Sequence, residues 1–426
     1  MSTPTLAPTR PAEPTGPAVE PTRKRRLPLW FWPAAFLGVI FVLAVLRVIT
    51  GANDVASSGV IGAAIALAVP IGLAGLGGLW SERAGVVNIG LEGMMILGTW
   101  GAGFFGYHLG PWAGIVGGMV CGIVGGLIHA LATVTFGVDH IVSGVALNIT
   151  AMGIAKYLAA RFFTDLPGGG PTQSPTLQSL PRLSVPGVSE PLGDLESQRI
   201  FFVSDLAGVV RGFTTNISAF TIIAVMLFVA TFFILWRTPF GLRLRSCGES
   251  PVAAETLGIN VIRYKFIAVS MSGALAGLGG AFLALVAANL YRDGQTGGRG
   301  YIGLAAMIFG NWRPGGLASG ALLFGYTDAA RLRGGGQTVH ALLLLIAVIL
   351  LLVGAWQLKR GNRVQGMLAL AAAMGAALWH FTTDTVPGEL TGATPYVTTL
   401  LVLAFAAQRL RMPAADGMIY RKGQAG

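Results

Sequence analysis

Long apolar runs, separated by short polar or glycine-rich stretches, make up most of the chain after residue 26. Most of these runs approach the roughly 20 residues that a helix needs to cross a bilayer. They cover residues 27–49, 59–79, 85–107, 112–134, 141–163, 214–236, 266–290, 339–356, 364–381 and 396–410. The pattern therefore predicts an all-α, polytopic membrane helix bundle.

Two further apolar runs, residues 301–310 and 317–330, are too short to span a bilayer and are separated by the sequence NWRPGG. Such segments are tolerated at membrane depth where protein or a water-filled cavity surrounds them. We therefore expect a re-entrant pair here. The whole bundle is expected to hold about 10–12 transmembrane segments, some of them broken or re-entrant.

The composition supports this class. With 53% hydrophobic and only 11% charged residues, the chain has too few charges to cover a soluble globule of 426 residues. Its 62 glycines fit helices whose backbones approach closely, since small residues favour helix association in lipid. Cys121 lies in an apolar run and Cys247 in a basic loop, so both are expected to be unpaired structural thiols.

The basic excess, a net charge of +11, predicts orientation rather than nucleic-acid binding, because it lies mainly in short loops and at the chain ends. It places the N-terminus of this multi-pass cell-membrane protein in the cytoplasm. We expect a disordered cytoplasmic tail over residues 1–26 and a core over 27–356, with an external loop at 164–213 and a cytoplasmic loop at 237–265. Residues 357–426 are expected to add about two spans and a cytoplasmic tail.

One apolar run, residues 84–105, contains Asn88 and Glu92, whose spacing puts both side chains on one face of a continuous helix. A carboxylate facing lipid costs several kcal/mol, so a broken helix bordering a hydrated pathway is expected. Two roles stay open: contact with substrate, or locking a bend through a backbone hydrogen bond or an ion pair with Arg83. Asn148 has the same alternatives, lining the passage or joining neighbouring helices.

Catalytic, metal and nucleotide sites are not predicted. The Asp139-His140 pair has no second His or Cys at ligand spacing and is expected to begin a helix. The chain also lacks G-x-x-x-x-G-K-[ST], the loop that cradles ATP phosphates. We therefore expect no catalytic residue, no metal and no cofactor in this chain, and ATP would be bound by another polypeptide.

The most specific local signal is GESPVAAETLGIN, residues 248–260. Ser250 suits the N-cap of a helix, Pro251 its first position, and Gly258 the position after its end. The loop is therefore expected to hold a short, sharply delimited helix. On local features alone, a helix lying on the membrane surface and a helix that binds another protein are both open.

Four other residues of this stretch would influence how it contacts a protein partner. Ala253 and Ala254 offer a nearly bare surface that another protein could approach closely. Glu249 and Glu255 favour the N-terminal half of the helix, where the helix dipole is positive.

Three separated stretches carry a family resemblance: ERAGVVNIGLEGMMILGTWGA, RSCGESPVAAETLGINV and GRGYIGLAAMIFGNWRPGGLASGALLFGYTDA. They resemble permease subunits of bacterial ABC importers, in the nucleoside and simple-sugar branch, which is related to ribose-type and branched-chain amino-acid permeases. The resemblance covers about residues 59–356. The sequence departs from this pattern at Ser250, where close relatives often carry Asn, and in about two spans after Arg363.

The resemblance implies that the loop helix docks into a cytoplasmic ATP-hydrolysing subunit through Ala253, Ala254 and Gly258, flanked by Glu249 and Glu255. It also implies a second related permease subunit in a heterodimer and an extracytoplasmic substrate-binding protein. The chain itself would then not be an enzyme. It would form the pathway for a small polar solute in the lipid bilayer.

Nucleosides are the expected substrate because VVNIGLEGMM fits that branch better than the ribose-type branch. A simple-sugar permease is the alternative. A proton- or sodium-coupled secondary transporter would also show broken helices, although it would not need the delimited cytoplasmic helix.

Overall fold

The computed structural model describes residues 28, 30–406 and 410–423. The predicted disordered tail, residues 1–26, lies outside this range. The chain forms two units, Met1–Val39 and Ile40–Gly426. The first unit contains the beginning of α1 (Phe31–Thr50), and every contact described below lies within the second.

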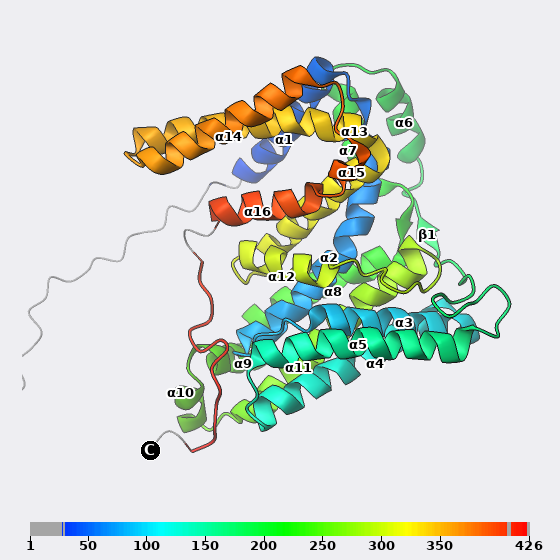
Figure 1. Cartoon of the computed structure of the whole chain (residues 1–426), viewed down its shortest axis with the longest axis vertical. Coiled ribbons are helices and arrows are strands. Elements are labelled where there is room, and N and C mark those ends of the chain that lie inside the picture. The colour runs from blue at the N-terminus through cyan, green and yellow to red at the C-terminus, as the bar shows by residue number, and fades with distance from the viewer. Residues whose placement is uncertain (1–27, 29, 407–409, 424–426) are drawn as a thin grey trace, which may run out of the picture. The chain divides into compact units, whose positions relative to one another are not determined.

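Helices account for nearly all of the regular structure (Figure 1). The long helices are α2 (Ser58–Arg83), α3 (Leu91–Leu109), α4 (Pro111–Ala130), α5 (His140–Phe163), α8 (Ala219–Arg237), α11 (Val261–Phe282), α13 (Pro314–Lys359) and α14 (Arg363–Thr382). The shorter ones are α6 (Ser189–Ser197), α7 (Val203–Thr214), α9 (Pro239–Glu249), α10 (Pro251–Thr256), α12 (Arg299–Phe309), α15 (Gly388–Thr391) and α16 (Thr394–Ala406). Strands β1 (Arg182–Leu183) and β2 (Ile217–Ser218) pair antiparallel.

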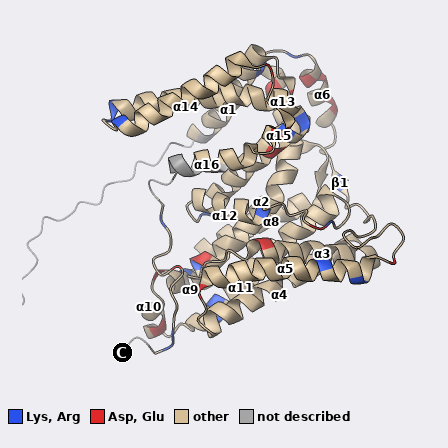
Figure 2. Cartoon of the chain, viewed as in Figure 1, with Lys and Arg blue, Asp and Glu red and all other residues tan. Residues whose placement is uncertain are grey.

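Eight of the described helices are long and apolar enough to cross a membrane, which confirms a polytopic helical membrane protein. Figure 2 shows that charged residues are sparse along these helices. The eight do not include α3 or α16, which the apolar pattern predicts as spans. The described part of α16 is too short, with 13 residues. By contrast, α3 is long enough, with 19 residues, but it is not apolar enough, because it contains Glu92, His108 and five glycines.

The expected re-entrant pair needs a correction. The first run lies in the short helix α12, as predicted, but the second belongs to α13. That helix continues into residues 339–356, and its backbone leaves helical geometry at Gly335, with φ 57° and ψ −151°. The arm before Gly335 begins at Pro314, so residues 317–330 are part of a segment long enough to span.

Close backbone packing of α3, α4 and α11 confirms the prediction made from the glycine content. A Cβ atom added to Gly98 or Gly118 would collide with the backbone of neighbouring helices, and one added to Gly122 would collide with the carbonyl oxygen of Gly273. Gly277 lies against the carbonyl oxygen of Gly118 in the same way. Helices in lipid associate through such close contacts because no hydrophobic effect drives them together.

The arm of α13 after Gly335 forms an antiparallel hairpin with α14 (Figure 1). Gly354 of α13 lies against Leu370 of α14, and Gly366 of α14 lies against Leu358 of α13. The predicted apolar segment 364–381 is therefore a helix paired with the preceding one.

We predict that Gly277→Leu destabilises the bundle by about 1–3 kcal/mol, because the larger side chain forces α4 and α11 apart. The purified protein in detergent should unfold at a lower temperature than wild type. Gly153→Leu is the control, since an added Cβ atom at Gly153 meets no atom within 4 Å. Equal melting temperatures for the two variants would contradict the backbone packing described above.

Candidate functional site

Between α2 and α3 the chain is not helical over residues 84–90, although most of this stretch is buried. Gly85 takes a positive φ of 80° immediately after α2 ends. The expectation that Asn88 and Glu92 share one face of a continuous helix is therefore wrong, because Asn88 precedes α3 and Glu92 lies in its first turn. The expected break in the helix is present, and we refer to residues 84–90 as the α2–α3 break.

The Asn88 side chain is fully buried and bonded on both sides of its amide. Its Nδ2 atom donates to Ser272 Oγ of α11 at 2.8 Å, and its Oδ1 atom accepts from the backbone N–H of Gly90 at 3.0 Å. Asn88 thus fixes the course of the break and attaches it to α11.

Glu92 binds the N-terminus of α12. Its Oε1 atom accepts from the Gly298 N–H at 2.9 Å, and its Oε2 atom accepts from the Gly300 N–H at 2.7 Å. A carboxylate there satisfies donors that the helix leaves free and complements the helix dipole. Arg83 is bonded elsewhere, with two guanidinium nitrogens donating to the carbonyl oxygen of Trp312.

Asn148 joins three segments from its place in α5. Its Oδ1 atom accepts from the Gly93 N–H at 2.7 Å, while Nδ2 donates to the Ile89 carbonyl at 3.0 Å and to the Tyr301 hydroxyl at 2.9 Å. Asn88, Glu92 and Asn148 are all buried. Their hydrogen-bond partners are protein groups. Each side chain therefore makes the kind of hydrogen bond expected of a residue that fixes a bend or joins neighbouring helices.

Sequence reasoning missed two more residues that bind the α2–α3 break. His129 Nε2 lies 3.1 Å from the Val87 carbonyl oxygen, and the Lys265 ammonium donates to the Gly85 carbonyl at 3.3 Å. His140, predicted only as part of a helix start, accepts from the Val87 N–H through Nδ1 at 3.2 Å. The available signal was the presence of a single His or Lys in or beside an otherwise apolar run.

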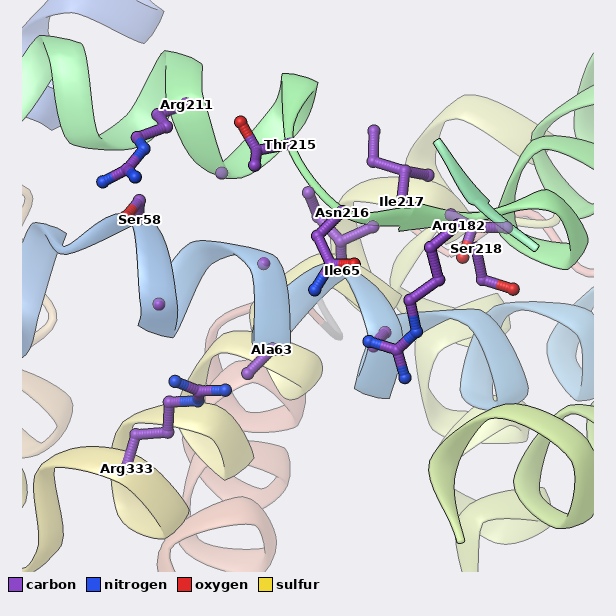
Figure 3. Close-up of a pocket in the computed structure, with 15 residues that line it drawn as sticks. Ser58, Ala63, Ile65, Arg182, Arg211, Thr215, Asn216, Ile217, Ser218 and Arg333 are labelled. Atoms are coloured by element: carbon purple, nitrogen blue, oxygen red, sulfur yellow. The ribbon is translucent and has the colours of Figure 1, made fainter. Parts of the chain in front are cut away.

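A polar cavity of about 330 Å³ lies at the other end of α2 (Figure 3). Ser58 and the following turns of α2 form one wall, and α7, β2 and the start of α8 form another. Thr215, Asn216 and Thr221 contribute hydroxyl and amide groups to the lining. The volume is within the roughly 300–1,000 Å³ typical of small-molecule pockets.

Three arginines from separate elements meet at this cavity. Arg182 extends from β1, Arg211 from α7 toward Ser58, and Arg333 from α13 (Figure 3). Arg211 is paired with Glu196 at 3.0 Å, and the same carboxylate accepts from the Ser58 N–H at 2.8 Å. The cavity therefore presents guanidinium donors, and no sequence motif joins these widely separated arginines.

The expected delimited helix in the 237–265 loop is α10, and its caps are those predicted. The Ser250 hydroxyl accepts from the Ala253 N–H at 3.4 Å, and Pro251 is the first helical residue. At the other end, Gly258 has a φ of 79°, with its N–H bonded to Glu255 and that of Ile259 bonded to Ala254. This pair of bonds is a Schellman motif, which needs the positive φ that glycine adopts freely.

The other residues expected to contact a partner differ in exposure. Ala253 is exposed, whereas Ala254 is buried against Cys247 and Val261, so the two alanines do not form one bare surface. Leu257, at the end of α10, is 80% exposed. The Glu249 carboxylate lies 3.8 Å from an Arg83 guanidinium nitrogen. Cys247 and Cys121 are both free thiols, as predicted.

The polar cavity and the region of α9 and α10 lie at opposite ends of α2. The polar cavity surrounds the start of α2, while α9 packs against the residues that follow its end. With 26 residues, α2 is about 39 Å long, enough to cross a hydrocarbon core of about 30 Å. Among the described residues, no group of three His, Cys, Asp or Glu side chains is placed to hold a metal ion.

The model of the family described as the permease component of branched-chain amino acid transport systems matches residues 60–354. The guanosine ABC transporter permease protein NupQ of Bacillus subtilis is 38% identical over 283 residues, which cover 65% of this chain and 82% of the relative.

Two other relatives extend this comparison. The nucleoside ABC transporter permease protein NupC of Lactococcus lactis is 31% identical over 363 residues, 83% of this chain and 94% of the relative. A putative glucose ABC transporter permease protein of Haloferax volcanii, TsgC13, is 32% identical over 278 residues, 65% of this chain and 78% of the relative. No solved structure matches the chain.

We predict that Glu92→Ala lowers the stability of the protein by about 2–3 kcal/mol, because it leaves the N–H groups of Gly298 and Gly300 without their buried acceptor. Thermal unfolding in detergent measures the effect. Glu92→Gln keeps one acceptor oxygen and should lose less. If both variants unfold at the wild-type temperature, Glu92 does not hold the start of α12.

Proposed function

This chain belongs to the family of branched-chain amino acid transport system permease components, and on that basis we propose that it is the transmembrane subunit of an ATP-driven importer. Two of its relatives are named as ABC transporter permease proteins. In this proposal the chain is not itself an enzyme, and a separate subunit hydrolyses ATP. The observation that carries the proposal is the match of the family model to most of the helical core, residues 60–354.

Nucleosides are the proposed substrate. Two of the relatives are named for guanosine and nucleoside transport, and the nucleoside relative NupC aligns with 83% of this chain. A sugar is the second candidate, favoured by the similarity to a putative glucose permease. Both are small, polar and rich in hydrogen-bonding groups, so the same kind of polar lining suits either.

The cavity at the start of α2 is proposed as the extracytoplasmic end of the pathway. Its hydroxyl, amide and guanidinium groups supply donors and acceptors to a neutral polar solute, and its position beside residues 164–213 agrees with the predicted external side of the membrane. Asn88, Glu92 and Asn148 are assigned a supporting part in this proposal. They fix the helices that surround the pathway, as their hydrogen bonds to Gly90, Gly300 and Gly93 indicate.

The opposite end is proposed to bind the cytoplasmic ATPase subunit through α10. Ala253 and Leu257 are exposed there, and Gly258 sets the end of the helix. Glu249, Ala254 and Glu255 support α10 from its inner side in this scheme. A second related permease in a heterodimer, an extracytoplasmic binding protein and a cytoplasmic N-terminus complete the proposed assembly.

We predict that Gly258→Arg abolishes uptake of labelled guanosine by cells that depend on this transporter. The substitution forces a side chain into a positive φ, at a cost of about 1 kcal/mol, and places a bulky charge at the end of α10. Gly361→Arg is a matched control, because Gly361 has a φ of 86° and lies in the turn between α13 and α14. Membrane levels of both variants should equal those of wild type.

Other outcomes of this uptake assay would overturn parts of the proposal. Uptake that survives Gly258→Arg but collapses with the proton gradient would make the protein a secondary transporter. Loss of glucose uptake in a deletion strain, with guanosine uptake unchanged, would move the substrate from nucleosides to sugars.

A further inference from the structure

The C-terminal segment, residues 410–423, returns from α16 to the region of α9 and α10 (Figure 1). We call it the C-terminal strap. The Arg411 N–H donates to Asn311 Oδ1 at 2.7 Å, in the turn before α13. Further along, the Ala415 N–H donates to the carbonyl oxygen of Gly248, near the end of α9, at 2.9 Å. The strap therefore crosses several segments that are far apart in the sequence.

One edge of the strap holds α9 and α10. Both acidic residues expected to serve ATPase coupling accept hydrogen bonds from its backbone: Glu249 from Ala414 and Glu255 from Gly423, each at 3.3 Å. The Tyr420 side chain packs on the buried cluster of Cys247, Ala254 and Val261. The strap thus covers the inner side of α10 and leaves Ala253 and Leu257 exposed on the other.

The other edge of the strap lies against the α2–α3 break. A Cβ atom added to Gly85 would lie 3.1 Å from the Ala415 carbonyl oxygen, and one added to Gly417 would lie 3.4 Å from the Val87 side chain. The Asp416 carboxyl group is buried and interacts with that of Glu82 in the last turn of α2. Glu82 also accepts a hydrogen bond from Trp312 Nε1.

We propose that the C-terminal strap is a tie that clamps the coupling helix α10 to the α2–α3 break, so that movement of a docked ATPase subunit is passed to the membrane core. This inference rests on the proposed importer function for the source of the movement. The contacts above define the path of the movement. It passes from α10 to the strap through Tyr420 and Glu255. It then passes from the strap to α2 and the break through Asp416 and Ala415.

The carboxyl groups of Asp416 and Glu82 make the docking of the strap depend on pH. Two ionised carboxylates repel each other, so Asp416 and Glu82 stay close most favourably when at least one of them is protonated. Burial of both carboxyl oxygens raises the pKa of Asp416 to about 7, against the opposing influence of the Lys265 and Arg83 charges. Because the pKa of Asp416 is about 3.8 in an exposed strap and about 7 in the docked one, docking weakens as pH rises from about 4 to 7 and changes little above pH 7.

Cys247 reports directly on the strap, because its thiol is buried beneath Tyr420. In a Cys121→Ala background, which leaves Cys247 as the chain's single thiol, we expect N-ethylmaleimide to label Cys247 on the order of tenfold faster when the chain ends at residue 409. A chain ending at Tyr420 is the matched control and should label at the full-length rate. Equal labelling of all three chains would overturn the proposal.

The pH dependence gives a second labelling test. Asp416→Asn keeps a polar group of the same size but cannot ionise, so its strap should stay docked at pH 8. The ratio of full-length to Asp416→Asn labelling rates should rise between pH 5 and pH 7, by up to about tenfold for each pH unit, and level off above pH 7. Thiolate formation affects both chains alike, so a constant ratio would show that Asp416 does not hold the strap.

The functional test uses the complete transporter reconstituted in proteoliposomes with its ATPase subunits and binding protein. The chain ending at residue 409 should still bind the ATPase subunits and hydrolyse ATP, while guanosine uptake per ATP falls on the order of tenfold. Loss of the ATPase subunits from this variant would make the strap a docking element instead of a tie. Absence of ATP-driven uptake in the full-length assembly would refute the importer function, with the labelling results unaffected.

Discussion

The interior of this protein depends on one constraint: the peptide groups of the α2–α3 break must be hydrogen-bonded without water. A helix satisfies its own backbone, but residues 84–90 have no such ladder in a region where unpaired groups cost several kcal/mol. The N–H groups of residues 84–86 still bond to carbonyl oxygens in the last turn of α2, and side chains bind several of the remaining peptide groups. Lys265, His129 and His140 bind the first half of the break, while Asn88 and Asn148 bind the second.

This constraint explains why polar residues stand in otherwise apolar runs. Apart from Asn88, which lies in the break, they come from three helices: His129 from α4, His140 and Asn148 from α5, and Lys265 from α11. Satisfying the break therefore also fixes these helices around it. Glu92 extends the arrangement to α12, whose first N–H groups it accepts. The glycines of α3, α4 and α11 then bring the backbones close enough for these short side chains to reach.

Local signals could be predicted from the sequence, and long-range ones could not. The caps of α10 follow from Ser250 and Gly258 because capping depends only on a few neighbouring residues. The relative positions of Asn88 and Glu92 could not be predicted from the sequence. They depend on the end of α2 at Arg83, and that end is stable only because distant side chains bind the backbone groups that follow it. The cavity was missed for a similar reason: Arg182 and Arg333 are brought together only by the fold. The strap, short and without periodicity, gives no sequence signal of where it binds.

The break in α13 has a mechanical consequence. The arm before Gly335 packs against α2, while the arm after it, running to Lys359, pairs with α14. The two arms meet at a single residue whose φ of 57° is open to glycine with little strain. The second arm is about 36 Å long, so a rotation of about 10° at Gly335 would carry its far end roughly 6 Å. Gly335 thus acts as a hinge for the hairpin, within the region matched by the family model and beside α2, the helix that joins the two ends of the proposed pathway.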